Sequence, residues 1–164
     1  MKKYLFTSIV CLLILSFTGI KNEKYSFRDL AFETSIDSIS GMTLIEDGGN
    51  TKFYVRESDT LKIGENKLES IHYGFYKGKL SSIIIKTTGY TNSRGVLDVL
   101  NENYGTPYRP NQFMDDYDWF GKKLTIMYDE NSATNNASIY FFSKPMADLE
   151  KADKKQSAKN SSGL

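Results

Sequence analysis

The clearest alternation of hydrophobic and polar positions lies between Leu68 and Thr88, a stretch that reads LESIHYGFYKGKLSSIIIKTT. Each half changes character at every second residue: Ile71, Tyr73 and Phe75 alternate with His72, Gly74 and Tyr76, and Leu80, Ser82 and Ile84 alternate with Ser81, Ile83 and Ile85. A period of two that is rich in β-branched and aromatic residues predicts strands. Lys77-Gly78 between the halves supplies the positive φ of a tight turn. We therefore expect a β-hairpin at the centre of an antiparallel sheet.

Shorter segments with the same period flank this hairpin on both sides. They predict strands at 42–45, 52–57 and 61–63 before it, and at 118–120, 123–128 and 137–142 after it. An extended lead-in at 22–28 and one or two helical turns around Ile36 and Ile39 precede these strands.

One segment has a helical period instead. Val96, Leu97, Leu100 and Tyr104 follow a 3.6-residue spacing, and Gly105-Thr106-Pro107 is a stop signal. This pattern predicts a helix at about 92–104 whose apolar stripe lies on a sheet. The fold class that follows is α+β, with a twisted antiparallel sheet of about five to seven strands and this one main helix packed on one face.

The first twenty residues differ in composition from the rest of the chain. Lys2 and Lys3 precede an apolar run at 5–15, and Ser16 and Thr18 are small residues suited to a cleavage site. This layout predicts a secretory signal peptide at 1–20, and so an exported, periplasmic or extracellular protein. The alternative is an uncleaved membrane anchor, because the apolar segment approaches the roughly 17 residues that span a bilayer.

The remaining sequence divides into two parts. Residues 21–145 carry all the strand and helix signals described above and predict a single α+β domain. Residues 146–164 are dominated by Lys, Ala, Asp, Ser and Asn and predict a polar, largely disordered tail, with a frayed helix at 147–155.

Cys11 is the only cysteine, and it lies inside the N-terminal apolar run after Ile9 and Val10. A lipid-attachment cysteine would follow a small residue late in that run, so lipidation is not expected. Cleavage would leave the mature chain without cysteine, which excludes intramolecular disulfides, thiol catalysis and thiolate metal sites.

The charge of the chain limits the classes of partner that we expect it to bind. The formal net charge is +1, and lysine and arginine are dispersed along the sequence. Binding to nucleic acid needs a local basic surface, so no nucleic-acid partner is expected. Contact with a membrane is expected only through the N-terminal segment, if it stays uncleaved.

The order of signals in the second half supports a resemblance. A Gly78-Lys79-Leu80 hairpin leads into an Ile-rich strand, a helix ends at Tyr104-Gly105-Thr106-Pro107, and Trp119 and two further strands follow. This arrangement resembles small exported bacterial domains of the outer-membrane-assembly lipoprotein and β-lactamase-inhibitor-protein types. The resemblance implies a fold and an envelope setting, and it carries no catalytic residue across. The chain departs from the lipoproteins in lacking their lipid-attachment cysteine.

Aromatic residues make up 13% of the chain and lie on both faces of several predicted strands. One main helix covers one sheet face, so the other face would expose aromatic surface suited to binding. Our leading hypothesis is therefore a non-enzymatic envelope module that binds a protein or a ligand. Its candidate binding residues are Tyr54, His72, Tyr76, Tyr140 and Phe142. The alternative is that tyrosine is simply a common strand residue and that the terminal segments cover this face.

A second hypothesis rests on acidic residues near the last strands. The candidate ligands for a hard cation in a metal-dependent hydrolase are Asp115, Asp116, Asp118 and Asp129, and His72 is an additional candidate group of that site. The stretch DENSATNN fails the EF-hand pattern, because Ala133 occupies a ligand position. No nucleophile–base set or cofactor motif is recognisable, so no catalytic residue and no cofactor is predicted. A third hypothesis is a membrane-tethered structural domain.

Overall fold

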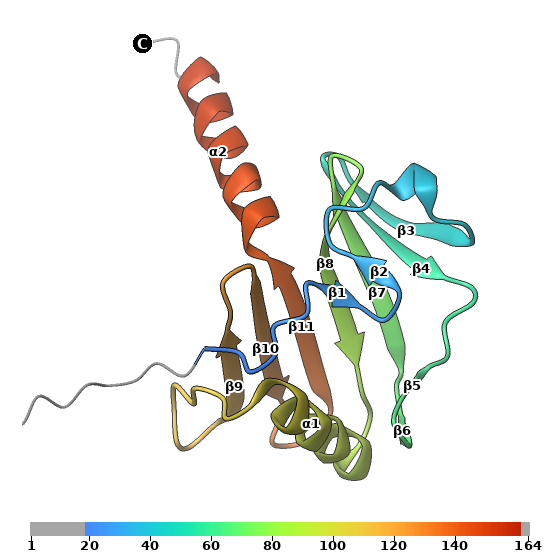
Figure 1. Cartoon of the computed structure of the whole chain (residues 1–164), viewed down its shortest axis with the longest axis vertical. Coiled ribbons are helices and arrows are strands. Elements are labelled where there is room, and N and C mark those ends of the chain that lie inside the picture. The colour runs from blue at the N-terminus through green and yellow to red at the C-terminus, as the bar shows by residue number, and fades with distance from the viewer. Residues whose placement is uncertain (1–18, 162–164) are drawn as a thin grey trace, which may run out of the picture.

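The computed structural model describes residues 19–161. Within them, seven strands form one antiparallel sheet in the order β3-β4-β7-β8-β11-β10-β9 (Figure 1). The strands are β3 (Met42–Gly48), β4 (Thr51–Arg56), β7 (Ser70–Tyr76), β8 (Lys79–Lys86), β9 (Asp115–Phe120), β10 (Leu124–Glu130) and β11 (Ala137–Ser143). The predicted α+β fold with a twisted antiparallel sheet is confirmed.

Smaller elements lie beside this sheet. Two short hairpins pair β1 (Ser26–Phe27) with β2 (Leu30–Ala31), and β5 (Lys62–Ile63) with β6 (Asn66–Lys67). A single 3-10 turn, η1, covers Ile36–Ser38. The brief strand expected at 61–63 is present, in a separate hairpin beside the main sheet.

Helix α1 (Tyr90–Tyr104) packs on one face of the sheet, as its apolar spacing predicts. Val96, Leu97 and Leu100 are buried there, and the hydroxyls of Ser93 and Thr87 lie 2.7 Å apart at its first turn. We call this side the covered face.

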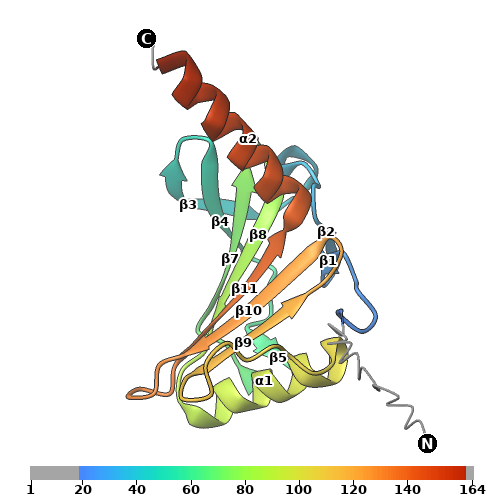
Figure 2. The ribbon, with the colours of Figure 1, turned by 90° about the vertical axis from the view of Figure 1, so that its left-hand side faces the viewer.

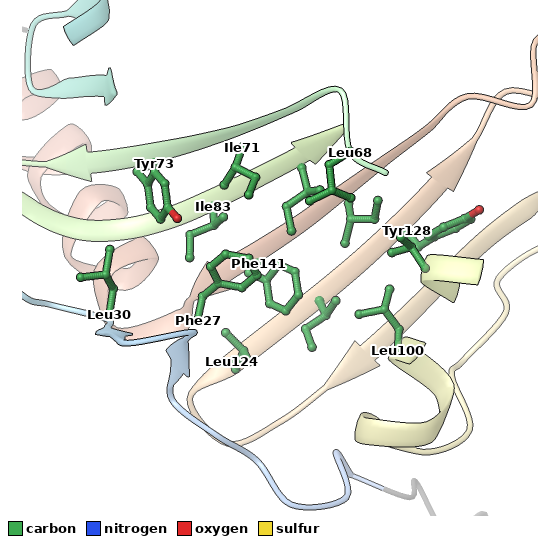
Figure 3. Close-up of a cluster of buried hydrophobic side chains, with 14 of the residues drawn as sticks. Phe27, Leu30, Leu68, Ile71, Tyr73, Ile83, Leu100, Leu124, Tyr128 and Phe141 are labelled. Atoms are coloured by element: carbon green, nitrogen blue, oxygen red, sulfur yellow. The ribbon is translucent and has the colours of Figure 1, made fainter. Parts of the chain in front are cut away.

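The β1–β2 hairpin covers another part of that face. Its Phe27 ring lies 5.5 Å from the ring of Phe141 and 6.4 Å from that of Tyr73, between centroids. Figure 3 shows Phe27 and Leu30 pointing at the sheet beside these rings. Burial of these apolar side chains at about 25 cal/mol per Å² is the main force that holds α1 and the hairpin on the sheet.

The central hairpin forms as predicted, but its alternation is interrupted. Gly74 pairs with Ser82 and Phe75 with Leu80, so Ser81 is an extra residue in β8. This bulge places Leu80 on the covered face together with Ile83 and Ile85, not with Ile84 as strict alternation predicts. The Ser81 hydroxyl donates to the Gly74 carbonyl at 3.0 Å and stabilises the bulge.

Helix α2 (Lys144–Ser161) continues directly from β11 and rises away from the sheet (Figures 1 and 2). The structure has this helix where we expected a largely disordered tail at 146–164. Two contacts explain the order. The amide of Met146 donates to the Ser143 hydroxyl at 3.1 Å, and Asp153 accepts a bond of 2.7 Å from the hydroxyl of Tyr76.

Residues 1–18, on which most of the predicted signal peptide falls, lie outside the described residues. Of the helices in 19–161, none is long and apolar enough to cross a membrane. The described chain begins as an irregular segment with a turn at residues 21–22, bonded to the domain by the amide of Lys21, which donates to the Tyr104 carbonyl at 3.0 Å.

Candidate functional site

The side of the sheet opposite α1 forms a regular lattice of side chains, which we call the open face. Alternation and strand pairing place three rows of residues on it, each row crossing β7, β8, β11, β10 and β9 in that order. The rows are Ser70, Lys86, Ser138, Asp129 and Asp116; His72, Ile84, Tyr140, Met127 and Asp118; and Gly74, Ser82, Phe142, Thr125 and Phe120.

These rows differ in burial from their neighbours on the covered face. Ile83 and Ile139 are 0% exposed, and they belong to the core cluster with α1 and the β1–β2 hairpin. Ile84, Met127 and Tyr140 are only partly buried and lie outside that cluster. Among residues 19–161, α2 is the helix that reaches this side, and it does so at the end marked by Tyr76 (Figure 2).

Two aromatic rings form the middle of the open face. Tyr140 and Phe142, two residues apart on β11, stack with ring centroids 5.9 Å apart and planes within 5°. Parallel apolar rings on an uncovered sheet face suit contact with apolar side chains.

The structure brings four of the five predicted binding residues to the open side. His72, Tyr140 and Phe142 lie in its rows, and Tyr76 lies on the same side at the α2 end, where it is 2% exposed. Tyr54 lies on the covered face, where its ring packs edge-to-face on Phe75 at 5.3 Å.

Sequence reasoning missed three apolar members of the open face, namely Ile84, Met127 and Phe120. Ile84 was hidden by the bulge at Ser81, which changes the alternation within β8. The signal that could have found Met127 and Phe120 was the pairing of β10 with the predicted strand 118–120. This register places both residues on the same face as Thr125.

The surroundings of His72 favour its neutral form. Burial lowers the pKa of its imidazole, and the nearby charge of Lys86 lowers it further, while Glu46 and Glu69 act in the opposite direction. His72 and Asp118 are at opposite ends of the same row, separated by Ile84, Tyr140 and Met127.

The four predicted metal ligands divide between the two faces. Asp116 and Asp118 alternate with Asp115 along β9, and Asp129 pairs directly opposite Asp116 on the open face. Burial raises the pKa of Asp118 and of Asp129, and repulsion from the neighbouring carboxylates adds to it. Like charges directly opposite each other on paired strands are unfavourable.

Asp115 lies on the covered side and is matched by cations. Its carboxylate lies 2.6 Å from Arg94 and 3.3 Å from Arg109. The hydrogen bond from Arg94 is the main reason that the pKa of Asp115 is lowered. Arg94 also lies 3.1 Å from the buried carboxylate of Glu130, which accepts a short hydrogen bond from the hydroxyl of Tyr128. This network attaches α1 to β9 and β10.

The aspartates therefore do not form one metal site. Within residues 19–161, no group of three or more His, Cys, Asp or Glu side chains is arranged to hold a metal ion. With Asp115 committed to Arg94 and His72 four strands away from β9, the geometry does not favour the metal-dependent hydrolase.

A charged hollow beside β4 is a weaker candidate site. Arg28, Arg56 and Lys62 contribute to its lining. However, Arg56 binds Asp29 through two bonds of 2.8 and 2.9 Å, and Arg28 lies 3.0 Å from Asp59. Both guanidinium groups are already paired, so the hollow offers little to an anion.

Comparisons with protein-family models, with curated proteins and with solved structures find no match for this chain. The fold and the open face therefore carry the functional argument.

Proposed function

We propose that this protein is a non-enzymatic binding module of the bacterial cell envelope, and that its open face is the surface that binds a partner protein. The observation that carries the proposal is the row of partly exposed apolar side chains on three adjacent strands, Ile84, Tyr140 and Met127, on the face that α1 leaves uncovered. A contiguous apolar patch of this kind on a sheet marks an interaction surface.

The chemistry of the face favours a protein over a small ligand. Its apolar residues lie on adjacent paired strands and are bordered on one side by the charged side chains Lys86, Asp129 and Asp116. An apolar centre with a polar rim is the usual composition of a protein–protein interface. The basic and apolar pattern of the N-terminal residues supports the envelope as the setting.

Capture from envelope extracts tests the proposal. The purified protein is compared with Tyr140→Ser and Phe142→Ser variants, which remove open-face rings, and with Phe113→Ser, which removes an aromatic side chain that is 86% exposed in a loop outside the three rows. Proteins retained by the wild type and by Phe113→Ser, but lost from both open-face variants, support the proposal. Circular dichroism checks that each variant is folded.

Retention of the same proteins by all four forms would show that the open face is not the binding surface. Retention of nothing above background by the wild type would contradict the proposal equally.

A further inference from the structure

The two halves of the open face complement each other across β11. On one side of β11 lie β8 and β7, and on the other lie β10 and β9. In the first row, Ser138 of β11 pairs with Lys86 on one side and with Asp129 on the other. In the second row, Tyr140 has Ile84 and Met127 as its two neighbours. A cation thus lies opposite an anion across β11, and an apolar side chain opposite an apolar one.

This arrangement matters when two sheets pack face to face. Consider a two-fold axis that runs along β11, midway between two open faces about 10 Å apart. Such an axis keeps each row over the same row and exchanges the two sides of β11. Lys86 then lies over Asp129 of the second copy, and Ile84 lies over its Met127.

The residues on the outer strands and those at the axis are also matched by this two-fold operation. His72 on β7 lies over Asp118 of the second copy. The position of Gly74, which the Phe53 ring of β4 covers, lies over its Phe120, so aromatic side chains meet there. At the axis, Tyr140 and Phe142 meet their own counterparts. Across the whole lattice, this operation places no pair of like charges directly over each other.

We propose that the open face binds a second copy of this chain, in a face-to-face dimer whose two-fold axis runs along β11. This inference rests on the proposed function and identifies a second copy of the chain as a partner of the open face.

The dimer also accounts for an electrostatic cost within one chain. Asp129 and Asp116 lie directly opposite each other, and among residues 19–161 no ion pair is formed by either of them or by Asp118. In the dimer, Lys86 of the second copy supplies the cation that Asp129 lacks. Facing sheets cross at about 30°, which displaces the outer pairs by several ångströms, a shift that a lysine side chain spans.

The area of the three rows limits the affinity of the dimer. Three rows on five strands cover about 500 Å² per copy at the usual strand and residue spacings, so a dimer buries about 1,000 Å², near the lower limit for a specific interface. Helix α2 leans over the same side at Tyr76, beyond the three rows, and β3 and β4 lie outside the overlap. We therefore expect a weak, reversible dimer with a dissociation constant in the micromolar range.

Sedimentation velocity over micromolar to submillimolar concentrations tests the dimer with the protein alone. Wild type and Phe113→Ser are expected to shift from monomer to dimer as concentration rises. Asp129→Lys and Lys86→Asp each set like charges against each other and are expected to weaken the homodimer by about tenfold or more. Phe142→Ser is expected to weaken it as well.

Mixing the two charge variants gives the sharper result. In a heterodimer of Asp129→Lys with Lys86→Asp, both charge pairs have opposite signs again. Association in the mixture is expected to return to within about threefold of wild type, as is that of the double variant, which restores both pairs in a homodimer. A variant that was merely unfolded would not be rescued by mixing.

A wild type that stays monomeric throughout overturns the dimer, as does a dimer that is indifferent to both charge variants and to Phe142→Ser. Neither result affects the envelope-extract comparison, so the binding function can stand when the dimer fails. A dimer that responds as described, together with unchanged capture by the open-face variants, would instead confine the face to self-association.

Discussion

A single carboxylate, that of Glu23, ties the N-terminal segment to the β9–β10 turn. It accepts hydrogen bonds from the backbone amides of Lys122, Lys123 and Leu124 at 2.8, 2.6 and 2.7 Å. Gly121 completes the site, because a Cβ there would collide with the Glu23 side chain. Burial by itself would raise the pKa of Glu23, but these amides and the charge of Lys144 outweigh it and lower the pKa.

The change Glu23→Gln tests this contact. Since the folded-state pKa lies below the ordinary value of 4.5, the stabilisation is complete above that value and is lost as pH falls through the folded pKa. At neutral pH the variant is expected to unfold about 1–3 kcal/mol more easily in urea, and the difference from wild type should shrink in acid. Glu102→Gln, at an exposed position on α1, is the control. Equal stability of Glu23→Gln and wild type at neutral pH would contradict the prediction.

On the open face, the pKa of Asp129 is shifted in the opposite direction from that of Glu23. Burial and the neighbouring charge of Asp116 raise the pKa of Asp129, so ionisation at neutral pH costs stability, and that cost disappears as pH falls through the raised value. Asp129→Asn is expected to stabilise the monomer by a few tenths of a kcal/mol, because water screens this exposed pair. Asp115→Asn, which removes the partner of Arg94, is expected to destabilise it. Thermal unfolding of dilute protein at neutral pH measures both, and stabilisation by Asp115→Asn would be the contrary result.

At the scale of elements, periodicity predicted the central hairpin and α1 but not the features that depend on tertiary contacts. The bulge at Ser81 lies beside Gly74, where a Cβ would collide with the Ser82 hydroxyl and the Phe53 ring. Helix α2 has a polar sequence, and its order comes from contacts with β7 and from the cap by Ser143. Composition alone contains neither contact.

Asp153 is the contact that holds the outer part of α2. It accepts a hydrogen bond from Tyr76 at 2.7 Å and lies 2.6 Å from Lys77. Asp153→Ala is expected to speed amide hydrogen exchange in the second half of α2 with little change in global stability, because the ion pair between Asp153 and Lys77 is solvent-exposed. Asp148→Ala, at an exposed position on the same helix, serves as the control. Unchanged exchange in Asp153→Ala would show that α2 is held by other contacts.

At the scale of the whole molecule, the sequence predicted the layers but not which residues share the uncovered one. His72, Tyr140 and Phe142 all lie on the open face, whereas Tyr54 is one position out of phase and packs on Phe75. Strands that are apolar on both faces give no signal of which face the helix covers, and a slip of one residue exchanges the faces. Strand order is equally hidden, because β11 lies between β8 and β10 although α1 and β9 separate β8 from β10 in the chain.

The direct passage from β11 into α2 has a mechanical consequence. No loop separates Ser143 from Lys144, and β11 is bonded on both sides, to β8 and to β10. Its ladder bonds run perpendicular to the strand, so a pull along β11 loads the bonds on its two sides together in shear instead of opening them one by one. Tension applied to α2 would therefore reach the interior of the sheet before it reached either edge strand.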